Sequence, residues 1–192
     1  MGCSNSTEVV SGVDAAVARV VAKRVSPVDA AFCSDKPTTL YLQEKFWLVP
    51  PTEDFLICCV ETGREVFCVQ GSSSSTAMKT LRDAATRAPI VHLKRDSVRL
   101  APTFNAFSAQ LAVTKLFTIE VHGSNCEDVT VEFINKATGE KCRMGMTGRW
   151  TTKQAALWDD YFVGVVAEID LALVVLVCMA LDEASGDRCS VV

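Results

Sequence analysis

The sequence lacks the motifs that usually bring catalytic groups together. It has no G-x-S-x-G nucleophile motif, no Walker phosphate loop and no G-x-G-x-x-G fingerprint. Its two histidines, His92 and His122, lie 30 residues apart, which leaves little for acid–base chemistry to use. The segment GSSSST, Gly71 to Thr76, has no phosphate-binding lysine and is typical of a loop, either a plain linker or a phosphorylated one. We therefore expect no enzyme activity and no cofactor.

Signs of a metal site or a disulfide framework are also missing. None of the nine cysteines forms a C-x-x-C pair, and neither histidine stands at a metal-ligand spacing. The cysteine count is odd, Cys58 and Cys59 are adjacent, and the first residues show no secretory signal pattern. The sequence predicts no metal site and reduced thiols in an intracellular protein, with small core side chains at Cys58, Cys59, Cys68 and Cys178.

The sequence has no excess of basic residues. The 192 residues carry a net charge of −4, whereas nucleic-acid binding depends on basic residues that displace counterions from phosphates. We expect no nucleic-acid partner, and any site for an anion must be a local cluster of basic residues.

No hydrophobic run is long enough to cross a bilayer. The run Leu171–Leu181 has eleven apolar residues, and a membrane-spanning helix needs about 20. Extending it back to Val163 includes Glu168 and Asp170, and each acid costs roughly 2.5 to 3.5 kcal/mol near the bilayer centre. A membrane span and a buried strand are the alternatives. Length and composition favour a buried helix that begins near Asp170 and ends before Gly186, after a strand at YFVGVV.

Short apolar runs alternate with turn residues from Thr38 to about Val166, the pattern of an antiparallel sheet that closes or nearly closes. Two hairpins carry Thr-Gly in their turns, at Thr62-Gly63 and Thr138-Gly139, which indicates two related halves or the recurrence of good turn residues. A wide barrel needs a filled interior. The predicted fold class is α+β, an antiparallel β-barrel enclosing a hydrophobic C-terminal helix. The runs are TTLYL, KFWLV, DFLICCV, REVFCV, PIVHLKR, LFTIEVH, VTVEFIN and EKCRMGM.

The order of these segments resembles the LURP-one-related proteins, which share the tubby-like architecture to which phospholipid scramblases are related. The resemblance covers SPVDAAFCSDKPTTLYLQEKF, DFLICCVETGREVFCV, MKTLRDAATRAPIVHLKRDSVRL, GMTGRW and VVAEIDLALVVLVCMALDE. It implies a barrel around an apolar helix led by Asp170, and it suggests phosphoinositide binding and a role in defence or signalling. The chain is shorter than the family pattern between Asp160 and Tyr161. The acids Asp159, Asp160 and Asp170 do not repeat a calcium-binding loop, and we predict a solvated turn.

The first six residues, MGCSNS, match the myristoylation pattern M-G-x-x-x-Ser/Thr, with Gly2 as the acceptor. One myristoyl chain binds a membrane only marginally, and palmitoylation of Cys3 would supply a second signal. Cys189 stands fourth from the carboxyl end, as prenylation requires, but Ser190 and Val192 are poor choices at their positions. We expect lipidation at the amino end and none at Cys189.

Residues 7–25, TEVVSGVDAAVARVVAKRV, are predicted to form an amphipathic helix. Valine and alanine recur at helical spacing, the basic residues Arg19, Lys23 and Arg24 lie on other faces, and Pro27 follows. This helix either lies in the lipid headgroup layer or packs on the barrel. The predicted domains are the lipidation motif with the amphipathic helix over 1–27, the barrel over 28–186 and a tail over 187–192.

Basic residues gather in two stretches, one between residues 79 and 99 and one between 141 and 153. Together they would give one face of the barrel a positive field for phosphoinositide headgroups, although outward charges also serve simply to keep a sheet soluble. The candidate residues for anionic lipid are Lys79, Arg82, Lys94, Arg95, Arg99, Lys141, Arg143, Arg149 and Lys153.

These patterns predict a non-enzymatic binding module held on the cytoplasmic face of a membrane, with the plasma membrane favoured, by its acylated amino terminus. There it binds anionic phospholipid or a protein partner; without lipidation it would be cytosolic. Two alternatives belong to other classes. One is a scramblase-like protein whose late helix inserts into lipid, and the other is a soluble enzyme or a binder of a small apolar ligand with an unfilled interior.

Overall fold

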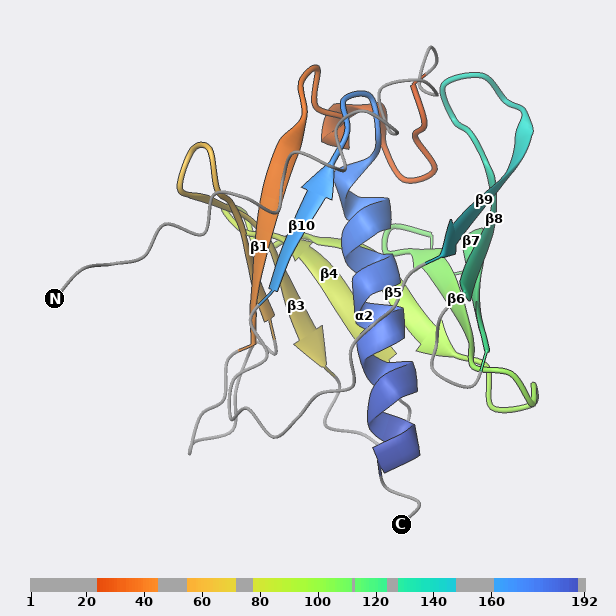
Figure 1. Cartoon of the computed structure of the whole chain (residues 1–192). Coiled ribbons are helices and arrows are strands. Elements are labelled where there is room, and N and C mark those ends of the chain that lie inside the picture. The colour runs from red at the N-terminus through yellow and green to blue at the C-terminus, as the bar shows by residue number, and fades with distance from the viewer. Residues whose placement is uncertain are drawn as a thin grey trace, which may run out of the picture.

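The computed structural model describes residues 24–44, 55–71, 78–111, 113–123, 128–147 and 161–189. Within these ranges a single antiparallel sheet curves around one long helix, α2 (Figure 1). A short 3-10 helix, η1 (Ala30–Phe32), precedes the sheet. The amphipathic helix predicted over 7–25 lies almost wholly outside the described residues, and so does the strand predicted at KFWLV.

Strands β1 to β8 each pair with the next strand along the chain, and β10 pairs with β1. The sheet has ten strands in the order β10-β1-β2-β3-β4-β5-β6-β7-β8-β9, and all nine pairings are antiparallel. Antiparallel strands that follow each other along the chain can be joined by short hairpin turns, as β2 and β3 are. The strands are β1 (Thr38–Glu44), β2 (Phe55–Cys59), β3 (Arg64–Gly71), β4 (Met78–Asp83), β5 (Pro89–Arg95), β6 (Thr103–Ser108), β7 (Lys115–His122), β8 (Asp128–Ile134), β9 (Lys141–Thr147) and β10 (Tyr161–Val165).

Helix α2 (Leu171–Cys189) follows β10 and runs through the interior of the curved sheet (Figure 1). Every side chain from Leu171 to Leu181 is buried except Val174, which is half-buried. The eleven-residue apolar run is therefore the centre of the core, and the prediction of a buried helix is confirmed. Its predicted end was wrong, because α2 continues past Gly186 to Cys189. One glycine costs a helix about 1 kcal/mol relative to alanine and does not end it alone.

The strands supply the rest of the core through alternate residues. In β7 the buried residues are Phe117, Ile119 and Val121, and in β8 they are Val129, Val131 and Phe133. Successive side chains of a strand point to opposite faces. The buried set of each strand therefore faces α2, and the intervening residues face outward.

Two glycines allow the hairpin turns that the sequence predicts. Gly63 in the β2–β3 turn has φ of +64°, and Gly139 in the β8–β9 turn has φ of +73°. Side chains rarely tolerate this left-handed backbone, whereas glycine adopts it readily. Both Thr-Gly hairpins are confirmed, as is the strand at YFVGVV.

Within the described residues β9 and β10 are the two edges of the sheet. The segment between them, residues 148–160, lies outside those residues. The antiparallel sheet with its C-terminal helix is therefore confirmed, but the described strands do not close the sheet, and the predicted barrel is shown only in this coarser form. Strands β4 and β6 complete the sheet although the apolar runs alone do not predict them.

Candidate functional site

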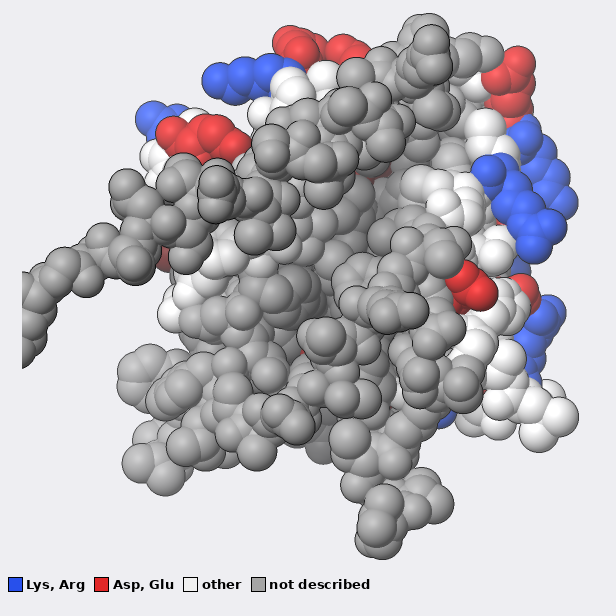
Figure 2. Space-filling model, viewed as in Figure 1, with Lys and Arg blue, Asp and Glu red and all other residues white. Residues whose placement is uncertain are grey.

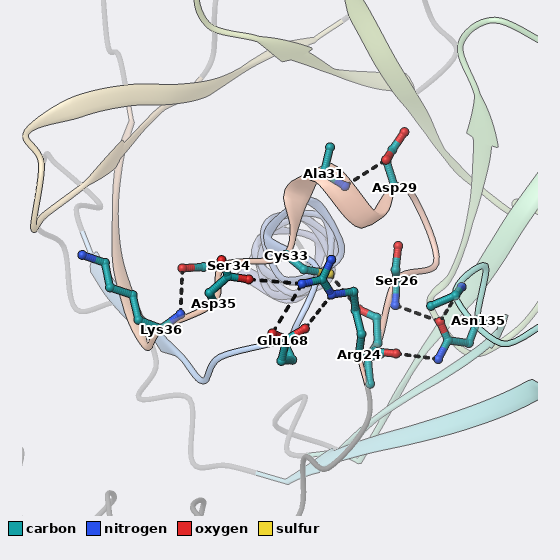
Figure 3. Close-up of polar contacts among 12 residues, drawn as sticks. Arg24, Ser26, Asp29, Ala31, Cys33, Ser34, Asp35, Lys36, Asn135 and Glu168 are labelled. Carbon is teal, nitrogen blue, oxygen red and sulfur yellow. Dashed lines mark hydrogen bonds and ion pairs between the residues drawn. The ribbon is translucent and has the colours of Figure 1, made fainter.

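Residues 24–37 lie across the end of the sheet at which α2 begins (Figure 3). Val25 pairs in parallel with Ile169, and Cys33 pairs antiparallel with Asp170. The ring of Phe32 on η1 meets the core ring of Phe67 edge to face, with 5.4 Å between centroids. These contacts make residues 24–37 a cap on the interior.

Asp170 joins this cap to α2 as a buried acceptor, so the solvated turn predicted for this residue was wrong. Its side chain is fully buried, and one oxygen, Oδ2, accepts hydrogen bonds from the backbone N–H groups of Val28 at 2.9 Å and Asp29 at 3.1 Å. The other oxygen, Oδ1, accepts from Ala172 at 3.0 Å and Leu173 at 3.4 Å, which is the N-cap arrangement that begins a helix. Burial raises the pKa of Asp170 to about 6, although the four N–H groups act in the opposite direction.

Arg24 is fixed in the same cap (Figure 3). Its Nε donates to Glu168 Oε2 at 2.5 Å, and its Nη2 donates to Asp35 Oδ1 at 3.1 Å. The hydrogen bond from Arg24 lowers the pKa of the Glu168 carboxyl. Arg24 and Val25 were predicted as the last residues of the amphipathic helix, but they are not helical. The Arg24 charge therefore faces protein acids and not lipid.

The β8–β9 turn is the third partner of the cap. The side chain of Asn135 accepts a hydrogen bond from the N–H of Ser26 at 3.1 Å and donates to the carbonyl of Arg24 at 2.8 Å. Lys136 Nζ donates to the carbonyl of Val28 at 2.5 Å. Segments more than a hundred residues apart are thus held together at the end of the interior where α2 begins.

At the end where α2 approaches its C-terminus, charged residues of the sheet meet charged residues of the helix. Lys79 Nζ on β4 lies 3.8 Å from Asp182 and 3.9 Å from Glu183, and 5.6 Å from the centre of the Phe55 ring. The three charged side chains are only 14 to 19 % exposed. Burial raises the pKa of Glu183, and Lys79 and Arg95 lower it. These contacts hold the second half of α2 in the sheet.

The predicted basic residues on the outside of the sheet mostly have an acid as neighbour. Arg99 Nη1 lies 2.7 Å from Glu120 Oε1, and Arg143 stands opposite Glu132 in the β8–β9 pairing. Lys141 lies 4.0 Å from the same Glu132. Figure 2 shows basic side chains along the side of the molecule formed by β8 and β9, with acidic side chains near them.

The candidate lipid-binding residues therefore divide into groups. Lys79 and Arg95 lie near the acids of α2, and Arg82 donates to Gln70 Oε1 at 3.0 Å and to a backbone carbonyl. Lys94 is exposed on β5, and Arg99, Lys141 and Arg143 are exposed elsewhere on the outside. Anionic-lipid binding stays a prediction. The candidates outside the described residues are Gly2, Cys3, Arg149 and Lys153.

The thiols and the exposed apolar residues were predictable only in part. Cys68 and Cys178 are buried as predicted, whereas Cys58 and Cys59 are half-buried. Burial raises the pKa of the Cys178 thiol to about 12. Sequence reasoning missed Val98 and Leu100, two exposed apolar side chains beside Arg99. Their positions between Asp96 and Pro102 mark a loop, but exposure is visible only in the fold.

A family model described as LURP-one-related matches residues 38–182, a range that begins with β1 and reaches Asp182 in α2. No curated protein and no solved structure shows a significant match to the chain. Among the helices in the described part of the chain, none has the length and apolar character to span a membrane.

Proposed function

Because the chain belongs to the LURP-one-related family, we propose that it is a non-enzymatic binding module tethered to the cytoplasmic face of a membrane. Acyl chains on Gly2 and Cys3 form the tether, and the fold binds anionic phospholipid or a protein partner at that surface. Family membership supports a binding module, and the tether rests on the MGCSNS motif.

The observation that carries the proposal is the burial of α2. The apolar residues Leu171–Leu181 form the core of the sheet, so inserting them into lipid would remove the interior of the fold. A membrane attachment must therefore use another part of the chain. The pattern M-G-x-x-x-Ser with an adjacent cysteine offers the two acyl signals that stable anchoring needs.

The buried charges support a structural rather than a catalytic use. Asp170 binds four backbone N–H groups, and Lys79 lies between the acids of α2 and the ring of Phe55. Each of these groups holds one segment of the fold against another. Catalytic groups, in contrast, must keep their reacting atoms available to a substrate.

Exposed basic residues support the anionic-lipid part of the proposal. Each lysine or arginine close to an anionic leaflet contributes about 1 kcal/mol of attraction. Lys94 and Arg143 are exposed on the outside of the sheet. Neighbouring acids such as Glu132 reduce this attraction, so the acyl chains provide most of the affinity and the basic residues bias it toward anionic membranes.

The proposal includes closure of the sheet into a barrel between β9 and β10. An apolar helix needs cover on every side, and α2 is buried around its whole circumference from Leu171 to Leu181 apart from the half-buried Val174. Within such a barrel α2 fills the interior space. This disfavours a small apolar ligand in the interior.

The test compares the wild-type protein with a Gly2→Ala variant, each produced together with an N-myristoyltransferase. We expect intact mass to show one myristoyl group on the wild type only, and flotation with phosphatidylcholine–phosphatidylserine vesicles to require it. An unmodified wild type, or equal flotation of both proteins, would contradict the proposal. Loss of lipid asymmetry in vesicles carrying the wild type would instead favour the scramblase alternative.

A further inference from the structure

The loop between β5 and β6, residues 96–102, exposes two apolar side chains at the end of the sheet where α2 ends. Val98 is 90 % exposed, and Leu100 is fully exposed. In the β4–β5 pairing Met78 lies opposite Lys94, and the neighbouring Lys79 reaches Asp182 and Glu183. The loop that follows Arg95 therefore lies on the side of the molecule where α2 approaches its C-terminus.

Hydrogen bonds hold this loop in a defined conformation, so the exposure of Val98 and Leu100 is a property of the folded protein. Asp96 N–H donates to the carbonyl of Thr103 at 2.8 Å, and Asp96 Oδ1 accepts from the N–H of Val98 at 3.1 Å. Arg99 is fixed by Glu120 at 2.7 Å. These bonds fix the loop on both sides of Val98 and Leu100, which point away from the core.

Basic side chains flank the two apolar ones. Arg99 stands between them in the sequence, and Lys94 is exposed at the end of β5. Two acids also contact this loop: Asp96 accepts from the N–H of Val98, and Glu120 pairs with Arg99, while Lys94 is exposed beside them. An apolar tip with cations at its base matches the boundary of an anionic bilayer, where acyl chains lie beneath phosphate groups.

We propose that Val98 and Leu100 insert into the acyl-chain boundary of the membrane, with Lys94 and Arg99 at the level of the lipid phosphates. The inference rests on the proposed tethering function and gives the bound domain an orientation, with the C-terminal end of α2 toward the bilayer. Once one of the two is bound, the acyl group on Gly2 or this loop, the other is held near the membrane, so its contact with lipid becomes effectively intramolecular.

The position of the tether permits this orientation. Arg24 lies at the opposite end of the interior, about 28 Å away along the 19-residue helix α2. Gly2 precedes Arg24 by 22 residues. With residues 7–23 in the predicted helix and the first residues extended, this stretch would span about 40 Å. The acylated end can therefore reach a bilayer on which the β5–β6 loop rests.

A second loop supplies a matched control. The connection between β6 and β7 also exposes two large apolar side chains, Leu111 at 63 % and Val113 at 92 %. It lies at the other end of β6, on the side where α2 begins. The two loops expose similar amounts of apolar surface at opposite ends of the sheet. Comparing them separates insertion of one end into the membrane from nonspecific binding by exposed apolar residues.

The experiment uses full-length myristoylated protein and vesicles of phosphatidylcholine with phosphatidylserine. Three variants are compared with the wild type by flotation: Val98→Ser with Leu100→Ser, Leu111→Ser with Val113→Ser, and Gly2→Ala. We expect the first pair to weaken binding about tenfold or more, because two apolar side chains lose their burial in lipid. The Leu111 and Val113 pair should bind as the wild type does. All four positions are exposed, and thermal unfolding checks that each variant keeps its fold.

The outcomes separate the two proposals. If Gly2→Ala abolishes flotation while the Val98 and Leu100 pair binds normally, the tether stands and the insertion loop is overturned. If the Leu111 and Val113 pair causes the same loss, the orientation is overturned. If Gly2→Ala binds as the wild type does, the proposed function fails first. A Val98 and Leu100 pair that binds vesicles normally but is lost from cell membranes would assign the loop to a protein partner and overturn lipid insertion.

Discussion

The carboxylate of Asp170 and the backbone N–H of Val28 lie 2.9 Å apart although 142 residues separate them in the sequence. The same carboxylate begins α2 by accepting from Ala172 and Leu173. One buried side chain therefore fixes both the start of the core helix and the cap that closes the interior above it. A substitution at Asp170 should therefore disturb both the helix and the cap.

Replacing Asp170 with alanine should lower the free energy of unfolding by about 3 kcal/mol at pH of about 4, where the contribution of Asp170 is fully present. The substitution removes a helix cap and leaves the N–H groups of Val28 and Asp29 without their acceptor. Asp170→Asn keeps one acceptor oxygen and should lose less. Urea unfolding followed by circular dichroism measures both. Asp29→Asn is the control, because that carboxylate is exposed and caps only η1, and a loss for Asp170→Ala as small as for the control would refute this role.

The stability of the protein should depend on pH through Asp170. Its pKa is about 6 in the folded protein and 3.8 ordinarily, so the folded state binds the proton more readily between these values. The contribution of Asp170 is fully present below pH of about 4 and falls by about 3 kcal/mol as pH rises through about 6. Asp170→Asn cannot titrate. Acidification should therefore make the wild type more stable relative to Asp170→Asn. If the difference in unfolding free energy between the two proteins did not change with pH, the burial of this charge would be contradicted.

Lys79 and Lys94 provide a matched pair of lysines on adjacent strands. Lys79→Met removes a cation that lies 3.8 Å from Asp182 and 3.9 Å from Glu183, both largely buried. It should lower the unfolding free energy by about 1 to 2 kcal/mol, less than for a fully buried pair. Lys94→Met, at an exposed position, should change it by less than about 0.5 kcal/mol. Thermal and urea unfolding measure both. The loss for Lys79→Met should shrink in acid, where protonation removes the charge of Glu183, and equal effects of the two substitutions would show that Lys79 is not tied to α2.

Leu176→Ala in the middle of α2 should lower the unfolding free energy by about 2 to 5 kcal/mol. The side chain is almost completely buried among the strands, and the surrounding sheet cannot collapse fully onto the cavity. Val98→Ala should have almost no effect on stability because Val98 is exposed. Calorimetry or urea unfolding separates the two. A loss of less than about 1 kcal/mol for Leu176→Ala would mean that α2 is not the packed centre of the fold.

The regular parts of the fold are predictable from the sequence because burial imposes a period. The run PIVHLKR corresponds to β5, Pro89–Arg95, and the Thr-Gly turns correspond to two hairpins with positive φ at glycine. Strand β6, Thr103–Ser108, was missed because Asn105 and Ala106 have weak strand propensity. Its place is set by pairing with β5 and β7, which lie on either side.

The contacts at the two ends of α2 depend on register and on backbone groups, which leave little trace in the sequence. Lys79 stands opposite the buried Leu93 in the β4–β5 pairing, so its side chain faces α2, while Lys94 on the next position of β5 faces outward. The sequence showed only that both lysines belong to a basic stretch. Asp170 was recognised as the start of the helix, but its N–H partners in Val28 and Asp29 carry no signature.

The most direct test of the central claim is amide hydrogen exchange of α2, measured on the myristoylated protein in solution and again bound to vesicles. If α2 is the enclosed core, the amides of Leu173–Leu181 should exchange only through global unfolding in both states, since core elements open with the full unfolding free energy. Faster exchange of these amides than of the strands in solution, or a change in their protection when vesicles are added, would contradict an enclosed helix and favour one that leaves the sheet for the membrane.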